Sequence, residues 1–294
     1  MTDRLDLLLD AQGGVATAGQ CVDALGRAAF EAGVGSGALT PVWTGIYSRA
    51  EPDSHLRLRG LDLRAGAPVP ICLQTAAAAY GFDTEGGSDL HVLTPVGHQL
   101  RASDGLVIHR RDGAPLTIVD GRPATAPAWT AIEVARSLRR PRALATLDAA
   151  LRSGACDERE LRLAVERQSG RRGIVQVREL LPLANPAAES PMESESRLVM
   201  IDGGLPAPVL QYEIVDRTGR LWRVDFAWPE YRLAVEYDGF DWHSDPDAFR
   251  RDRQKRAALW EAGWTMLSIV ADDVRGQPFD LCRRIRVELR PRAA

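Results

Sequence analysis

Two acidic residues stand inside otherwise apolar segments in the last third of the chain. Asp225 lies within residues 224–227 and Glu236 within residues 233–237, both runs otherwise rich in valine, leucine, alanine and aromatic side chains. A carboxylate on a packed strand is costly unless it is paired or binds a cation. On adjacent strands of a hairpin the two carboxylates can share one face, where Mg²⁺ or Mn²⁺ would relieve their repulsion. Glu193, one turn into a predicted helix, is placed to supply a third oxygen ligand.

The same acids also have purely structural explanations. Glu193 follows Ser190 by three residues, which is the spacing of a helix capping box. Each of the other two acids has arginines nearby for an ordinary ion pair: Arg220 and Arg223 for Asp225, and Arg253 and Arg256 for Glu236. For each acid alone the structural explanation is favoured, but two acids on neighbouring strands together favour a cation site.

The block from 189 to 294 must position these acids. Ser190 followed by Pro191 marks the start of a helix. Three strand-like runs come next, then an arginine-rich helix, a strand and a last amphipathic helix; we expect them at 208–216, 221–229, 231–239, 246–262, 264–270 and up to about Leu289. The order αβββαβα places Asp225 and Glu236 on adjacent strands.

The run from 224 to 274 resembles the very-short-patch-repair-like branch of the PD-(D/E)XK nucleases. Such proteins show a strand aspartate, a strand E-x-D-G, a following histidine, D-x-x-x-R on the next helix and G-W before the next strand. These positions correspond here to Asp225, Glu236, Asp238 with Gly239, His243, Asp252 with Arg256, and Gly263 with Trp264. The resemblance implies an αβββαβ restriction-endonuclease-like domain in which Asp225 and Glu236 bind the metal, with Glu193 as the helix glutamate.

One position departs from that pattern, because Asp238 stands where the superfamily has a lysine. The only lysine of the chain, Lys255, falls on the following helix. His243 has a side chain whose ordinary pKa suits a general base, and its structural alternative is packing on Trp242. Nearby arginines are expected to hold the nucleic-acid backbone, or else to form a solvated helix face: Arg250, Arg251, Arg253 and Arg256.

The front of the chain reads as two further segments. Residues 1–50 show helix, turn, helix and a strand pair at 42–49, which is a winged-helix pattern. Residues 51–185 alternate strands with helices, including a long helical run from Trp129 to Leu151 that is broken at Pro141, and 180–188 reads as a linker. These two segments resemble AbiEi-type antitoxins, in which the winged helix binds operator DNA. The expected fold is therefore mixed α+β, with a winged helix, a middle α/β domain and the nuclease-like domain at 189–294.

The residues expected to read DNA are unusual for that task. The stretch 20–37 is rich in glycine and acidic residues and holds a single arginine, Arg27, whereas a helix that reads the major groove usually offers more donors. A winged helix used for protein contact is the alternative. His91 and His98 flank a strand-like run without an acid at useful spacing, so we expect them on the surface.

Composition narrows the possible functions. Charges nearly cancel, with 37 basic and 40 acidic residues and a formal charge of −3, so any DNA contact must come from a local patch. Four cysteines are scattered without zinc-site spacing, and no apolar run approaches the roughly 18 residues of a membrane span. We expect a cytosolic protein without a membrane partner.

The sequence supports two functions from different classes. The leading one is a divalent-metal-dependent endonuclease that hydrolyses phosphodiester bonds in DNA during repair or defence. The alternative is a non-catalytic DNA-binding regulator or antitoxin with a degenerate nuclease fold. The expected partners are DNA and, with it, a toxin or a repair protein; a weaker third option is a repair accessory protein that binds damaged DNA without cutting it.

Overall fold

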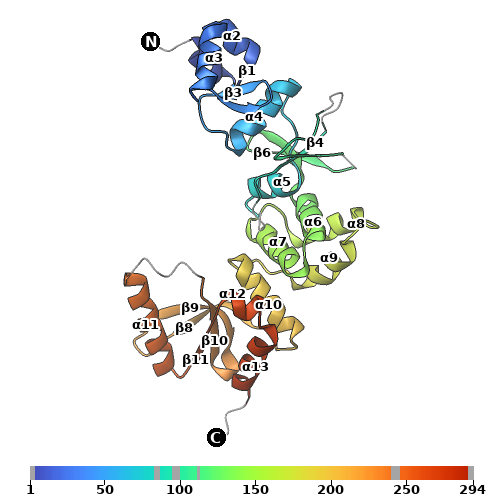
Figure 1. Cartoon of the computed structure of the whole chain (residues 1–294). Helices are drawn as coiled ribbons and strands as arrows, with labels where there is room; N and C mark the ends of the chain where they lie inside the picture. Colours follow the sequence, from blue (N-terminus) through green and yellow to red (C-terminus); the bar gives the residue numbers. More distant parts are fainter. Residues whose placement is uncertain (1–3, 83–86, 95–99, 111–112, 240–245, 291–294) are drawn as a thin grey trace. The chain divides into compact units, whose positions relative to one another are not determined.

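The computed structural model describes residues 4–82, 87–94, 100–110, 113–239 and 246–290 (Figure 1). It divides into two compact units, unit 1 (Met1–Thr130) and unit 2 (Ala131–Ala294). The three domains expected from the sequence stay a prediction. Within the described ranges, no helix is both long and apolar enough to cross a membrane.

Unit 1 begins with three helices and a small antiparallel sheet of strand order β1-β3-β2. Its first elements are α1 (Arg4–Ala11), β1 (Ala16–Thr17), α2 (Ala18–Leu25), α3 (Arg27–Gly35), β2 (Thr40–Trp43), β3 (Ile46–Ser48) and α4 (Ser54–Ala65). Helices α2 and α3 are separated at Gly26, which takes the left-handed value φ 83° between them. The β2–β3 hairpin is tied to α4 by the Trp43 indole N–H, which donates to the Arg57 carbonyl oxygen at 2.7 Å.

The rest of unit 1 holds two strand pairs. It comprises α5 (Leu73–Ala79), β4 (Leu90–Leu93), β5 (Leu106–His109), β6 (Leu116–Val119) and β7 (Arg122–Thr125), and it ends within α6 (Pro127–Ser137). Strands β4 and β5 are parallel, whereas β6 and β7 form an antiparallel hairpin. One apolar core of unit 1 joins Trp43 and Leu61 to Ile71, Val92 and Ala124.

Unit 2 starts with helices. These are α7 (Arg140–Arg152), α8 (Glu158–Arg167), α9 (Ile174–Leu180), the short 3₁₀ turn η1 (Leu181–Leu183) and α10 (Pro191–Asp202). The expected break of the long helical run falls between α6 and α7, with Pro141 in the first turn of α7. The predicted linker at 180–188 packs inside this unit: Ala188 is fully buried, and the Asn185 N–H donates to Asp148 Oδ1 on α7 at 2.8 Å.

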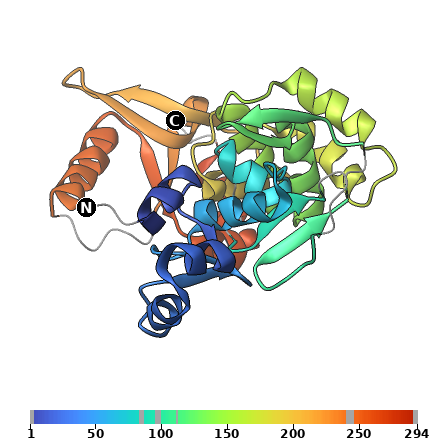
Figure 2. The same cartoon turned by 90° about the horizontal axis from the view of Figure 1, so that it is seen from above.

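A four-stranded sheet completes unit 2. Its elements are β8 (Val209–Val215), β9 (Leu221–Trp228), the turn η2 (Pro229–Tyr231), β10 (Leu233–Tyr237), α11 (Pro246–Glu261), β11 (Thr265–Ile269), α12 (Ala271–Arg275) and α13 (Pro278–Glu288). The strand order is β11-β10-β9-β8, with antiparallel β8–β9–β10 and parallel β10–β11. Helix α11 covers one face of the sheet, and α10, α12 and α13 lie on the other (Figures 1 and 2).

Candidate functional site

Three polar side chains lie next to one another on the α11 face of this sheet, one on each of three strands. The antiparallel ladder ends with Val235 opposite Phe226, and the next residues along the two strands are Glu236 and Asp225, which line one cavity. Glu236 in turn pairs with Ser268 in the parallel ladder. Residues in register on neighbouring strands share a face. We call these three residues the polar row; its two carboxylates border one cavity of about 400 Å³.

Lys255, from α11, reaches across to this row. Its ammonium group donates to Glu236 Oε1 and, at 2.5 Å, to the Arg223 carbonyl oxygen. Burial lowers the pKa of Lys255, and the charge of Asp225 works in the opposite direction. This contact of Lys255 was not predicted from the sequence, although one signal was present: 36 of the 37 basic residues are arginine, and the single lysine lies here.

Asp225 is the more unusual of the two carboxylates. Its Oδ2 accepts a hydrogen bond from the Tyr237 N–H at 2.8 Å. Burial raises the pKa of Asp225 above its ordinary value, although this bond and Lys255 lower it. The arginine pairing proposed for it is not formed, because Arg223 binds Glu189 through two contacts of 2.8 Å. Asp225 is therefore a half-buried acid whose charge is only partly compensated.

Glu193 forms only half of the capping box expected with Ser190, because its side chain accepts from the Glu189 N–H. Its N–H donates to Ser190 Oγ at 3.1 Å, and its Oε2 accepts from the Glu189 N–H and the Gln211 amide, each at 2.9 Å. Burial raises the pKa of Glu193, and the charge of Asp225 adds to the increase. Gln211, which the sequence did not single out, holds a left-handed φ of 49° between Leu210 and Tyr212, which pair with Phe226 and Val224 on either side of Asp225. Glu193 thus lies at the start of the helix, and the charge of Asp225 raises its pKa.

The other predicted site residues lie around the same cavity or outside the described residues. Asp238 borders the cavity, and its Oδ2 lies 3.4 Å from Arg256 Nη2. Arg256 also donates to Asp252 and to Ser268, so it joins α11 to the polar row. The remaining arginines on α11 expose their side chains: Arg250, Arg251 and Arg253. His243 lies outside the described residues.

The arrangement combines two carboxylates with one buried amine. Within the described part of the chain, no three His, Cys, Asp or Glu side chains group around one point as metal ligands. The carboxylate oxygens of Asp225 and Glu236 are nevertheless the donor type that Mg²⁺ and Mn²⁺ take. The raised pKa of Asp225 marks a place where added positive charge would be favourable. The two carboxylates are therefore the type of ligand that a divalent ion needs. In this structure the positive charge next to them comes from Lys255.

Two histidines of unit 1 correct an expectation. His91 is half-buried rather than on the surface, and its Nδ1 lies 2.9 Å from His109 Nε2 on the parallel strand β5. Burial lowers the pKa of His109, and the neighbouring His91 lowers it further. His98 lies outside the described residues.

This pair predicts a pH dependence of stability. The unfolded chain takes up a proton on His109 near the ordinary histidine pKa, whereas the folded chain resists it, so stability is lost as the pH falls below about 6.5. His109→Gln is expected to flatten the slope between pH 7 and 5.5 by up to about 1.4 kcal/mol per pH unit. Urea unfolding at several pH values measures it. His55→Gln, at an exposed position on α4, is the control; an unchanged slope in His109→Gln would contradict the assignment.

Known proteins match both the middle segment and most of the chain. Residues 69–183 match the family described as AbiEi antitoxin C-terminal domain. The uncharacterized proteins MT2308 and Rv2248 of Mycobacterium tuberculosis, from strains CDC 1551 / Oshkosh and ATCC 25618 / H37Rv, are each 56% identical over 259 residues, which is 88% of this chain and 95% of theirs. The crystal structure of RV2827C protein from Mycobacterium tuberculosis aligns with a TM-score of 0.44 and 17% identity, over 71% of this chain and 86% of that one.

Proposed function

Because this chain belongs to one family with those two mycobacterial proteins and its residues 69–183 match the AbiEi antitoxin C-terminal domain, we propose that it is a DNA-binding regulator of the antitoxin type, with a toxin as its protein partner. The AbiEi match is the observation that carries this proposal. The sequence favoured the endonuclease over the regulator. With the AbiEi match, the regulator becomes the leading proposal and the endonuclease the second.

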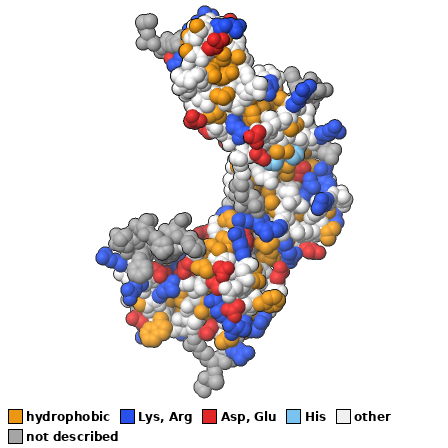
Figure 3. All heavy atoms as spheres, viewed as in Figure 1, with side chains coloured by type: hydrophobic (Ala, Val, Ile, Leu, Met, Phe, Trp, Pro, Cys, Tyr) orange, Lys and Arg blue, Asp and Glu red, His pale blue; other side chains and the backbone are white. Residues whose placement is uncertain are grey.

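The front of unit 1 supports the DNA-binding part of the proposal. The order α1-β1-α2-α3-β2-β3, with the sheet order β1-β3-β2, agrees with the predicted winged helix and supports that interpretation. In such an arrangement α3 would enter the major groove. Its exposed residues include three alanines and the ion-paired Arg27 and Glu31, so Arg27 is its one long exposed donor and it offers few donors to base edges. In Figure 3 basic and acidic side chains are interspersed over the visible face, so we expect modest affinity with contacts mainly to the DNA backbone.

The test is binding of the full chain to the DNA upstream of its own gene. We expect specific binding by fluorescence anisotropy, weakening as salt is raised, and at least roughly tenfold weaker binding to shuffled DNA. Ala28→Glu, which places a carboxylate on the exposed face of α3, is expected to weaken binding roughly tenfold by repelling phosphate. Ala67→Glu, at an exposed position after α4, is the matched control.

Equal affinity for both DNAs, or full affinity in Ala28→Glu, would reject this role for α3. A protein that binds no DNA but co-purifies with a toxin would leave only the protein-contact part of the proposal.

A second candidate function is metal-dependent cleavage of nucleic acid, and the polar row with Lys255 favours it. Lys255, from α11, donates to Glu236, and this contact supports a role for Lys255 in place of the lysine that the PD-(D/E)XK pattern has where this chain has Asp238. Mg²⁺ or Mn²⁺ held by Asp225 and Glu236 would polarise a phosphate oxygen and acidify a bound water. In this function Lys255 orients that water, and the exposed arginines of α11 hold the phosphate backbone.

A further inference from the structure

The tip of the β8–β9 hairpin carries a charged side chain that neither function above uses. Arg220 lies directly before β9, and its guanidinium stacks over the indole ring of Trp222, with 3.9 Å between the guanidinium carbon and the ring centroid. The same indole lines the cavity that Asp225 and Glu236 border. The hairpin therefore holds a guanidinium next to one wall of that cavity.

One carboxylate fixes the turn that carries Arg220. Asp216 Oδ1 accepts hydrogen bonds from the Thr218 N–H at 2.8 Å, from the Thr218 hydroxyl at 2.6 Å and from the Arg220 N–H at 3.0 Å. Its Oδ2 accepts from the Trp222 indole N–H at 2.8 Å. The hydrogen bonds from Thr218 and Trp222 hold the pKa of Asp216 below its ordinary value. Asp216 thus sets both the backbone of Arg220 and the orientation of the ring on which Arg220 stacks.

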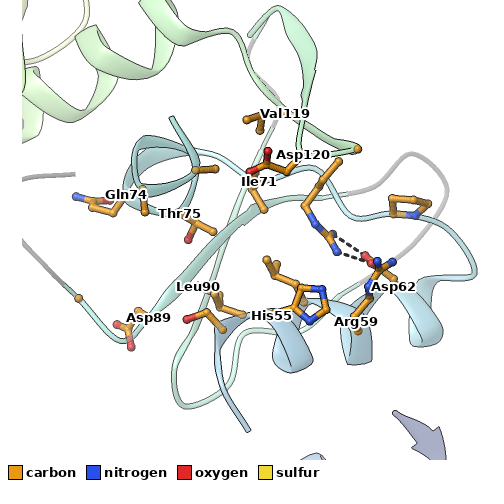
Figure 4. A pocket seen from close by; sticks show the side chains of 18 residues that line it. His55, Arg59, Asp62, Ile71, Gln74, Thr75, Asp89, Leu90, Val119 and Asp120 are labelled. Carbon is orange, nitrogen blue, oxygen red and sulfur yellow. Dashed lines mark hydrogen bonds and ion pairs between the residues drawn. The ribbon is translucent and has the colours of Figure 1, made fainter. Parts of the chain in front are cut away.

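The guanidinium of Arg220 is available to a ligand. The residue is exposed and, among the described residues, forms no ion pair. Arg122 in unit 1 is the opposite case: it donates to both carboxylate oxygens of Asp62, at 2.8 and 2.5 Å, so its charge is neutralised within the chain (Figure 4). A stacked arginine without such a partner presents a planar fork of N–H donors in a fixed orientation, which matches the oxygens of a phosphate or a carboxylate.

The surroundings of Arg220 favour an anion with repeated charges over a single carboxylate. Residues 216–223 contain three arginines and one acidic residue. Arg251 and Lys255 line the same cavity from α11, which lies beside the hairpin and shares an apolar cluster with it (Figures 1 and 2). A strand that runs between the hairpin and α11 would therefore meet basic side chains on both sides. DNA, with a phosphate on every nucleotide, supplies negative charge along such a path.

We propose that Arg220 binds a backbone phosphate of a DNA strand, adjacent to the phosphate that would lie at the polar row. This proposal rests on the second candidate function and deepens it by naming a positioning residue for its substrate. Arg220 donates from its N–H fork to the phosphate oxygens. Its stack on Trp222 limits the orientations that the fork can take, so less conformational freedom is lost when the strand binds. The contact fixes where the strand lies and takes no part in breaking a bond.

The test is binding of short fluorescein-labelled DNA, single-stranded and duplex, to the full chain in the presence of EDTA. All chains compared carry Ala28→Glu, so that contacts made by α3 contribute little. Arg220→Gln is expected to weaken binding to at least one of the two DNAs roughly tenfold, and to reduce the slope of log K against log salt concentration by about one. Arg220→Lys, which keeps the charge but not the planar fork, is expected to recover only part of the affinity. Arg283→Gln, at an exposed side chain on α13, is the matched control for the loss of one positive charge.

DNA with methylphosphonate linkages, which carry no charge, separates a phosphate contact from a structural effect of the substitution. With this DNA, Arg220→Gln is expected to bind like the chain that keeps Arg220. Three results would overturn the proposal: unchanged affinity of Arg220→Gln for both charged DNAs, an equal loss in Arg283→Gln, or an equal loss with the uncharged DNA.

Nicking with Mg²⁺ or Mn²⁺ judges the nuclease function separately. Loss of affinity in Arg220→Gln, without nicking by the unaltered chain, would reject the nuclease and retain the role of Arg220 in binding the strand. Nicking by the unaltered chain, with unchanged affinity in Arg220→Gln, would reject the role of Arg220 and retain the nuclease.

Discussion

Arg197→Leu is expected to lower the free energy of unfolding by about 3 to 5 kcal/mol, because it leaves a buried carboxylate without its partner. Asp148 on α7 is fully buried, and Arg197 on α10 donates to both of its oxygens at 2.9 and 2.7 Å. Burial raises the pKa of Asp148 even with the arginine in place. Urea or thermal unfolding of the full chain, followed by circular dichroism, measures the loss.

Two further variants separate the ion pair from the packing. The double change Asp148→Leu with Arg197→Leu is expected to cost less than Arg197→Leu alone, because no unpaired charge remains buried. Arg162→Leu, which breaks the exposed i,i+4 pair with Glu158, is expected to cost about 0.5 kcal/mol or less. If Arg197→Leu costs no more than Arg162→Leu, the buried pair does not hold α7 and α10 together.

Asp225→Asn is expected to reduce Mg²⁺- or Mn²⁺-dependent nicking of supercoiled DNA by at least about a hundredfold. The amide keeps an oxygen for the Tyr237 N–H but removes a metal-binding charge. Burial raises the pKa of Asp225 in the folded chain above its value in the unfolded chain. The free energy of unfolding therefore falls as the pH rises through this pKa, because the folded chain must then hold a buried negative charge. Asp225→Asn removes this charge and is expected to be at least as stable as the unaltered chain at pH 7. Lys255→Met is expected to lose activity about equally.

The controls separate cleavage from binding. Asp280→Asn, on α13 at a partly exposed side chain, is expected to nick like the unaltered chain. Asp225→Asn is expected to keep its affinity for DNA, measured by anisotropy in the absence of metal. The absence of nicking by the unaltered chain on double-stranded DNA, single-stranded DNA and RNA with both metals would eliminate the nuclease function and leave the regulator untouched.

The local features of the site could be predicted from the sequence. Alternation along two adjacent strands was sufficient to place Asp225 and Glu236 on one face, and the register supports that placement. The cap at Ser190 was readable because a capping residue and its partner are three residues apart. The strands β8, β9, β10 and β11 also lie within the expected ranges.

Contacts that depend on tertiary packing could not be predicted. The reach of Lys255 to Glu236 depends on how α11 packs across the sheet, which no sequence spacing specifies. The same holds for His91 and His109, which meet through parallel pairing of β4 and β5. The β6–β7 hairpin was missed because Pro123 interrupts a run that otherwise has strand character.

Helix α10 has a consequence for how this gene can evolve. It lies beyond the AbiEi match, which ends at residue 183, yet Arg197 neutralises Asp148 inside the matched segment, and Glu195 binds both Arg142 and Arg275. A recombination event that separated the antitoxin-like segment from α10 would expose a carboxylate evolved for burial. We therefore expect the two parts to be inherited together, and a shortened descendant to need a compensating change at Asp148.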